Sequence, residues 1–248
     1  MESTGQAFAA HHRWDRNFFL FMIGLIWLGV IMGFGPGVLK HFTGERQDNP
    51  LIVHLHAAVF VAWLALLTTQ ALLIRTNRRA THKKLGGGLA LLAVVMIAIG
   101  PLAEVAIQVD RFGTPRSRPA FLAVSIFLMV AFAGLVGVAL KRRADAALHK
   151  RLILMATIMI ASAGYARWTG KWITEMIGRD HFWGNFTFLY LGVNVLFAIM
   201  VGYDLVTRRR LHPAMVAGLV WLLTIQLISV WLYFSPWWLR FCTTLIGH

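Results

Sequence analysis

The sequence predicts an all-α integral membrane protein, a single transmembrane domain of seven helices. Hydrophobic residues make up 58% of the 248 residues and charged residues only 14%, which is more apolar side chain than one soluble core can bury. The apolar runs reach about 20 residues without the alternation of β-barrel strands, so they can cross about 30 Å of hydrocarbon as helices. Basic residues gather in alternate connections between these runs. This asymmetry is typical of a multi-pass membrane protein.

Seven spans follow from the apolar runs. In chain order they cover residues 17–39, 51–74, 85–107, 119–140, 152–168, 183–206 and 213–234. No connection between them is long and polar enough to form an extramembrane domain, so one domain covers residues 1–248.

One further helix is expected on the surface. In the segment 170–181, apolar Trp172 and Met176 alternate with charged Lys171 and Glu175. This spacing is typical of a short amphipathic helix that lies flat on the membrane. We expect it on the outer surface, just before the sixth span.

Charge gives the orientation and the first expected partner. The loops 75–84, 141–151 and 208–210 hold most of the 24 basic residues, which predicts a cytoplasmic N-terminus and a C-terminus on the outer side of the membrane. The net charge of +14 is then explained by membrane lipids with anionic headgroups, and we expect no nucleic acid partner. A single cysteine, Cys242, excludes an internal disulfide and any cysteine-rich metal site.

A histidine stands at the end of each of these basic connections, close to the start of the next span. His82, His149 and His212 are about 65 residues apart, a spacing that suggests an internal repeat. The repeat would give one helix plus three hairpins, with the three histidines at the same depth on the cytoplasmic face. Chance and the composition of membrane interfaces explain the pattern equally well.

Two other features limit the class of protein. The last span contains no lysine, so a retinal Schiff base is excluded. The run Gly86-Gly87-Gly88 predicts close packing between helices or room for a flat ligand.

The second span carries the most informative histidines, His54 and His56. On a regular helix they are about 200° apart, so they cannot both face one site. His56, Trp63 and Gln70 instead form a stripe that drifts by only about 40° along the helix. Polar groups in a span tend to face the bundle. His56 is therefore the better ligand candidate, and His54 is expected to face the outer loops.

An imidazole nitrogen at this position can ligate haem iron or a transition metal. The expected cofactor is haem b or such a metal, and a second ligand on the outer side would come from His41 or His181. The alternatives are that His56 only hydrogen-bonds a neighbouring helix, or that it handles protons or a quinone.

Glu104 and Arg167 lie near the outer ends of the third and fifth spans. Because an isolated charge at that depth costs several kcal/mol, each should find a partner. The preferred interpretation is a salt bridge between the two. The alternative uses Glu104 as a metal ligand or a proton acceptor.

Together these motifs resemble a known group. The order His56, Gln70, His82-Lys-Lys-Leu-Gly86 is similar to bacterial predicted polytopic membrane proteins without an assigned function, in which a His-bearing helix precedes a loop ending His-[Lys/Arg]-x-Leu-Gly. His149-Lys-Arg-Leu and the helix reaching Arg167 resemble the second half of that group. The resemblance implies a bacterial inner membrane protein, in which the outer C-terminus would be periplasmic. More loosely, the chain resembles b-type haem electron carriers with histidines at both membrane faces, although His82 and His149 sit at the interface and not one or two turns inside.

The leading hypothesis is a membrane haem- or metal-binding protein that transfers electrons or assists a redox complex. A second hypothesis is an accessory subunit of a larger membrane redox or pigment complex, which binds lipid or pigment without chemistry of its own. A small transporter is the third. Few charges and few prolines interrupt the spans, which argues against the broken helices of many transporters.

Overall fold

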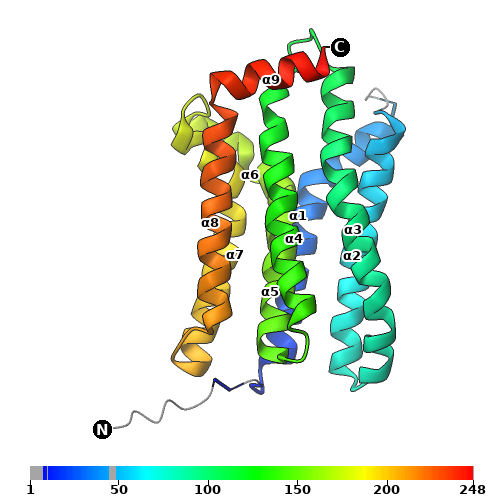
Figure 1. Ribbon diagram of the computed structural model, residues 1–248, viewed down its shortest axis with the longest axis vertical. Coiled ribbons are helices and arrows are strands. Elements are labelled where there is room, and N and C mark those ends of the chain that lie inside the picture. The colour runs from blue at the N-terminus through cyan, green and yellow to red at the C-terminus, as the bar shows by residue number, and fades with distance from the viewer. Residues whose placement is uncertain (1–7, 10, 45–48, 248) are drawn as a thin grey trace.

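The computed structural model describes residues 8–9, 11–44 and 49–247, and within these ranges it is all-helical, as predicted. The helices are α1 (Asp15–Phe42), α2 (Leu51–Arg75), α3 (Arg79–Asp110), the short 3-10 helix η1 (Pro119–Phe121), α4 (Leu122–Lys141), α5 (Ala146–Ile160), α6 (Ser162–Ile177), α7 (Phe182–Arg208), α8 (Pro213–Tyr233) and α9 (Pro236–Ile246). Most of them run along the long axis of one bundle (Figure 1). We call the end where α1 begins the lower end, and the end crossed by α9 the upper end.

Six of these helices are long and apolar enough to cross a membrane: α1, α2, α3, η1 with α4, α7 and α8. The pair α5 and α6 passes the same test together, either as one broken span or as a re-entrant loop, so the described helices give six spans, or the predicted seven if the pair is one span. Large apolar side chains are exposed on the flanks, for example Leu91 at 68% and Val206 at 75%. This is the surface expected of a multi-pass membrane protein in contact with lipid.

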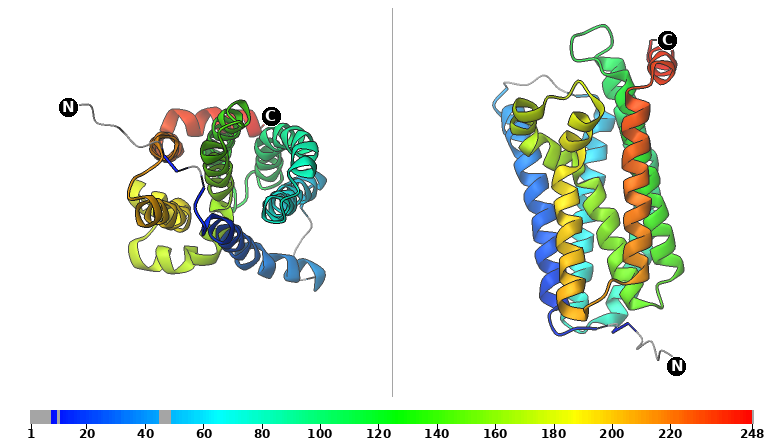
Figure 2. Two further views of the ribbon diagram at one scale, coloured as in Figure 1. Left: turned by 90° about the horizontal axis from the view of Figure 1, so that it is seen from below. Right: turned by 90° about the vertical axis from the view of Figure 1, so that its left-hand side faces the viewer.

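The helices that follow α1 lie in three groups across the bundle. Seen along the long axis, α2 and α3 lie together at one side, α4 and α5 lie in the middle, and α6, α7 and α8 lie at the other side (Figure 2). The most deeply buried helix is α5, in which every side chain from Leu154 to Met159 is buried. The core therefore sits where α5 meets α4, α7 and α8, and the α2–α3 pair lies at the periphery.

Side chains and prolines fix several helix starts. The Asp145 carboxylate accepts hydrogen bonds from the backbone N–H groups of Ala147 and Leu148, both at 3.0 Å, and so caps α5. Pro213 and Pro236 open α8 and α9, where the missing N–H of proline costs nothing.

The predicted boundaries were wrong around the fifth span. The span was expected to end at residue 168 and a separate amphipathic helix to begin at 170, but α6 runs unbroken through both positions. The break instead falls at Ala161, where α5 and α6 are bent by 47°. The sequence there, Ser162-Ala163-Gly164, is composed of small residues of the kind found at kinks that lack proline.

Close contacts with α1 and α7 explain why α6 turns away from α5. A Cβ on Gly164 would lie 2.6 Å from the carbonyl oxygen of Gly29, and one on Gly192 would lie 2.6 Å from the Tyr165 side chain. The Tyr165 hydroxyl donates a hydrogen bond to the Leu25 carbonyl at 2.8 Å. These contacts hold α6 against α1 and α7.

The last helix, α9, was not predicted. It crosses the upper end of the bundle (Figure 1) and buries Cys242 and Ile246 against Leu122. Trp238 Nε1 donates a hydrogen bond to the carbonyl of Ala120 at 3.1 Å. The helix therefore covers the connection from α3 to α4.

The glycine run of α3 does not pack closely against another described helix. Nothing lies within 4 Å of a Cβ built on Gly86, Gly87 or Gly88. The packing interpretation of this run was wrong, and room for a flat ligand stays a prediction.

Candidate functional site

The stripe on α2 faces the bundle, as predicted. Trp63 is 2% exposed and Gln70 is 5% exposed, while His54 is exposed. Trp63 Nε1 donates a hydrogen bond to Thr157 Oγ1 on α5 at 3.2 Å. His56 lies at the upper end of this stripe.

The His56 imidazole is half-buried and incompletely hydrogen-bonded. Its Nδ1 atom is buried and has no hydrogen-bond partner in the described part of the chain, and its ring centroid lies 4.2 Å from that of Phe60. The positive charge of Arg167 on α6 is close enough to act on the ring. A buried imidazole nitrogen without a partner costs free energy unless a ligand or water satisfies it.

The two other outer histidines have different surroundings. His41 lies beside His54, with ring centroids 5.7 Å apart. His181 caps α7: its Nδ1 accepts a hydrogen bond from the Gly184 N–H at 3.2 Å, and its Nε2 lies 3.0 Å from the Ile177 carbonyl. Since both of its ring nitrogens are engaged, His181 has a structural role as a cap. Its ligation of a cofactor stays a prediction that would require losing these bonds.

Glu104 is tied to the turn between α3 and α4. Its carboxylate accepts a hydrogen bond from Gln108 Nε2 at 2.7 Å, and Gln108 Oε1 in turn accepts one from the Arg118 N–H at 2.7 Å. The charge of Arg167 also acts on Glu104, while Arg167 Nη1 donates to the carbonyl of Ala163 at 2.8 Å. A direct Glu104–Arg167 salt bridge stays a prediction.

Two of the lower-end histidines, His149 and His212, contact backbone groups near helix ends. His212 Nδ1 accepts a hydrogen bond from the Ala214 N–H at 3.1 Å and so caps α8. His149 Nδ1 lies 2.9 Å from the carbonyl of Ala139 at the end of α4. Each of these contacts holds one helix to its neighbour or to its own first turn.

The third lower-end histidine, His82, lies in the first turn of α3. Within residues 8–9, 11–44 and 49–247, its buried Nδ1 has no hydrogen-bond partner, and neither has either amide atom of Gln70 across the α2–α3 hairpin. The Gln70 backbone and the charge of His149 both act on the His82 ring. The predicted stripe on α2 therefore ends in unsatisfied polar atoms at both ends of the bundle.

No three or more His, Cys, Asp or Glu residues within the ranges 8–9, 11–44 and 49–247 are placed to share a metal ion. A metal bound by protein alone needs three or four such ligands. In the described part of the chain, Glu104 has no such set of ligands around it.

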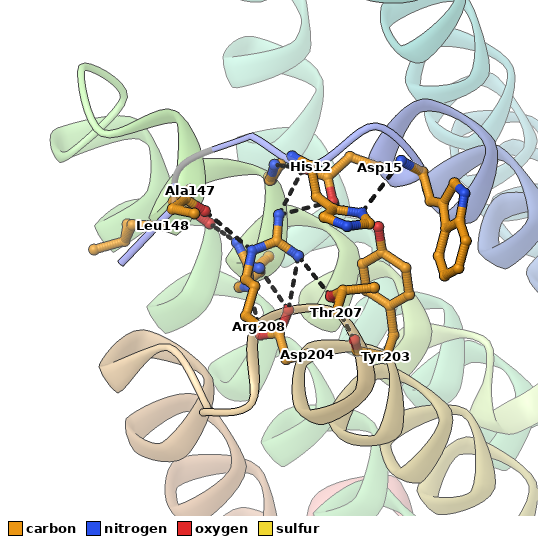
Figure 3. Close-up of polar contacts among 12 residues, drawn as sticks. His12, Asp15, Ala147, Leu148, Tyr203, Asp204, Thr207 and Arg208 are labelled. Carbon is orange, nitrogen blue, oxygen red and sulfur yellow. Dashed lines mark hydrogen bonds and ion pairs between the residues drawn. The ribbon is translucent and has the colours of Figure 1, made fainter. Parts of the chain in front are cut away.

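Sequence reasoning missed a buried charged network at the lower end (Figure 3). The Asp15 carboxylate at the start of α1 accepts hydrogen bonds from Lys150 Nζ at 2.6 Å, from Arg208 Nη2 at 2.8 Å and from the Tyr203 hydroxyl at 2.7 Å. The Tyr203 ring also stacks on Phe18, with centroids 3.7 Å apart. The network thus joins the starts of α1 and α5 to the end of α7.

The second carboxylate of the network, Asp204, is more deeply buried. It accepts two parallel hydrogen bonds from Arg151, through Nε at 2.8 Å and Nη2 at 2.6 Å. Arg208 Nη1 lies 3.5 Å from the same carboxylate. The side chains of Arg151 and Asp204 are each 1% exposed and that of Arg208 is 2% exposed. Phe8 covers both guanidinium groups, at 4.8 and 5.3 Å from its ring centroid.

One signal in the sequence could have found this network. Asp204 is an acid inside the sixth span, four residues before Arg208, and acids in spans rarely lack a partner. The identity of the main partner, Arg151, depends on the tertiary fold.

A second polar group missed from the sequence lies between α7 and α8. Asn194 and Gln226 exchange amide hydrogen bonds at 3.2 and 3.0 Å, and the hydroxyls of Tyr190 and Ser229 are 2.7 Å apart. Because these groups satisfy one another, they hold the two helices together.

Comparison of the sequence with protein-family models and with curated proteins, and of the fold with solved structures, finds no match.

Proposed function

We propose that the chain is a membrane haem b protein that passes electrons or assists a redox complex, in which His56 would bind the iron. The observation that supports this proposal is the Nδ1 of His56, which is buried and has no hydrogen-bond partner among the described residues, on a stripe that faces the bundle. Such an imidazole is suited to a cofactor, because an iron–nitrogen bond or a hydrogen bond to the cofactor would satisfy it.

Haem fits these residues better than a transition metal held by protein alone. Haem supplies four of its own nitrogen ligands and takes only one or two from the protein, whereas no set of three protein ligands is present among the described residues. Arg167, whose charge reaches His56, would pair with a haem propionate. When bound, the haem would supply one-electron redox chemistry; the chain would supply the ligand, the cation and the apolar surroundings.

The first prediction tests His56 against His54. We expect protein purified from a haem-replete host to be coloured, with a reduced-minus-oxidised difference spectrum typical of haem b. The change His56→Ala should lower the haem content at least about tenfold, because it removes the imidazole that would bind the iron. The change His54→Ala should leave the content near that of the wild type, because His54 is exposed on another face of α2. Haem content is measured as the pyridine haemochrome per chain.

Circular dichroism and the thermal unfolding midpoint provide the control, since His56→Ala should leave the helical fold intact. A colourless wild-type protein would contradict the haem proposal and favour an accessory subunit, which should instead co-purify with larger partners. Full haem retention by His56→Ala would also contradict the assignment of the ligand.

The second prediction concerns the orientation that we propose, with the lower end in the cytoplasm of a bacterial cell and the C-terminus in the periplasm. Support comes from the basic connections α2–α3, α4–α5 and α7–α8, which all lie at the lower end (Figure 1). A reporter enzyme that folds only after export, fused behind the last residue, should be active. If a reporter that works only in the cytoplasm is active at this position instead, the proposed orientation is wrong.

A further inference from the structure

Three buried polar atoms without a hydrogen-bond partner lie together near the hairpin that joins α2 to α3, at the lower end of the bundle (Figure 1). Within the part of the chain that the structure describes, they are both amide atoms of Gln70 and the Nδ1 atom of His82. Gln70 is 5% exposed, and its backbone is close enough to hydrogen-bond the His82 ring. We call this place the Gln70–His82 site. Leaving such atoms buried without partners costs free energy, which favours the binding of a molecule that satisfies them.

Open space lies beside the Gln70–His82 site, on the same face of α3. Gly86 follows His82 by four residues, about 40° around the helix, and the Cβ atoms of a helix tilt toward its N-terminus. A side chain at Gly86 would therefore point toward the imidazole, yet nothing lies within 4 Å of a Cβ built there. Gly87 has the same space but lies about 140° from His82 around α3. Of the glycine run, Gly86 is thus the residue that leaves room beside the site.

The hydrogen-bonding needs of the three atoms favour a hydroxyl group. Gln70 Oε1 is an acceptor and Gln70 Nε2 is a donor. Because the His82 Nδ1 atom has no partner among the described residues, the ring nitrogen that faces the Gln70 backbone is Nε2. With its proton on Nε2, the imidazole has an acceptor at Nδ1. Two of the three atoms therefore need a donor, which a carbonyl, carboxylate or phosphate oxygen cannot be. The charges of Lys83 and His149 act on the His82 ring and disfavour a cationic donor.

The surroundings of the site favour a ligand that is dissolved in the membrane. The site lies between two helices that are long and apolar enough to cross a membrane, and Leu85, next to Gly86, is 40% exposed. The three atoms are enclosed as they stand. A ligand therefore meets them when the His82 ring turns into the space at Gly86, a change between staggered rotamers. The space of one missing side chain suits a thin aromatic ring with a hydroxyl group better than a branched glycerol headgroup.

We propose that the Gln70–His82 site binds a lipid-soluble quinol. One hydroxyl group of the quinol lies between the Gln70 amide and His82 Nδ1, and the aromatic ring takes the space at Gly86. The choice of a quinol among aromatic alcohols rests on the electron transfer proposed above. The site itself does not, because it lies at the opposite end of α2 from His56. The matching quinone has only acceptor oxygens, so it satisfies Gln70 Nε2 alone and binds more weakly.

The third prediction tests this site with the purified full-length protein in detergent, without oxygen. The protein is titrated with a decyl-substituted benzoquinol and, separately, with the matching benzoquinone, and bound ligand is counted by native mass spectrometry. We expect the quinol to bind about tenfold more tightly, the effect of one hydrogen bond that the quinone cannot make. Gln70→Leu should lower the affinity for the quinol about tenfold for the same reason. Gly86→Leu should abolish binding, because its side chain fills the space beside His82.

The matched control is Gly87→Leu, which adds the same side chain at a glycine with the same space, on another face of α3, and should leave the affinity unchanged. If Gly86→Leu fails to fold by circular dichroism, Gln70→Leu decides the question, because it only replaces a buried amide by an apolar group of similar size.

Equal binding of quinol and quinone, or wild-type affinity in the decisive variant, would overturn the proposal. Equally tight binding of decanol would show that the site takes any apolar alcohol, and would also overturn it. The count of bound quinol needs no haem. A colourless protein that binds the quinol therefore contradicts the haem proposal alone, and a coloured protein that does not bind it contradicts this inference alone.

Discussion

Replacing Asp204 with alanine is expected to lower the free energy of unfolding by about 3–5 kcal/mol, the usual cost of leaving a buried charge without its partner. Arg151 is 1% exposed and makes two hydrogen bonds to the Asp204 carboxylate. Without that carboxylate its guanidinium stays buried among apolar side chains and Phe8. Arg208 would keep its hydrogen bond to Asp15. The buried charge that loses its partner is therefore mainly that of Arg151.

Two further variants test whether the destabilisation comes from the buried, unpaired charge and not simply from removing a carboxylate. Glu175→Ala removes an acid that is 60% exposed and 3.9 Å from its lysine, and should cost less than about 1 kcal/mol. The double change Arg151→Met with Asp204→Leu should recover most of the loss, because an apolar pair of similar size leaves no buried charge. The free energy is measured by denaturant titration in mixed micelles. If Asp204→Ala lowers the free energy of unfolding by less than about 1 kcal/mol, the prediction is wrong, and Arg151 is then solvated by water as an exposed ion pair would be.

The network has a consequence for the N-terminal segment. Arg208 donates through Nε to the carbonyl of Ala9 at 3.0 Å, and His12 N–H donates to the Asp15 carboxylate at 3.0 Å. These hydrogen bonds hold the described residues before α1 against the lower ends of α5 and α7. Phe8 also contacts His212 there. Since Asp15 and Asp204 share Arg208, changes at either carboxylate should be coupled.

The spans could be predicted from the sequence because lipid exposure leaves long apolar runs with few charges. The stripe on α2 could also be predicted, because helical periodicity alone places Trp63 and Gln70 on the face of His56. The break at Ala161 could not be predicted. It depends on close contacts of Gly164 with α1 and of Tyr165 with α7, and these partners are far away in the chain.

The charged network shows a second limit of sequence reasoning. Asp204 and Arg208 are one helical turn apart, so the sequence suggests a local pair. The stronger bonds of Asp204 go to Arg151, 53 residues away, and a single sequence gives no measure of such a distance in space. The sequence alone also does not show which hydrogen bonds a histidine makes. His181 was therefore a candidate ligand, although its ring nitrogens contact the backbone of Gly184 at the start of α7 and of Ile177 at the end of α6.

The crossing of α1 and α6 gives the second large expected effect. A Cβ on Gly33 of α1 would lie 2.1 Å from the carbonyl oxygen of Gly164 on α6. This atom belongs to the backbone of a helix, so it can move only if the two helices separate. Close approach of backbones at glycines is a common way for transmembrane helices to associate, because it increases van der Waals contact.

Gly33→Ala is therefore expected to destabilise the protein by about 2–3 kcal/mol or more, the cost of inserting a methyl group into a packed interface. Gly24→Ala on the same helix is the matched control, because nothing lies within 4 Å of a Cβ at that position. It should be neutral or stabilise the protein by up to about 1 kcal/mol, since alanine favours the helix over glycine. Both values come from unfolding in mixed micelles. Equal stability of the two variants would mean that α1 and α6 do not meet at Gly33 and Gly164, and the bend between α5 and α6 would then need another cause.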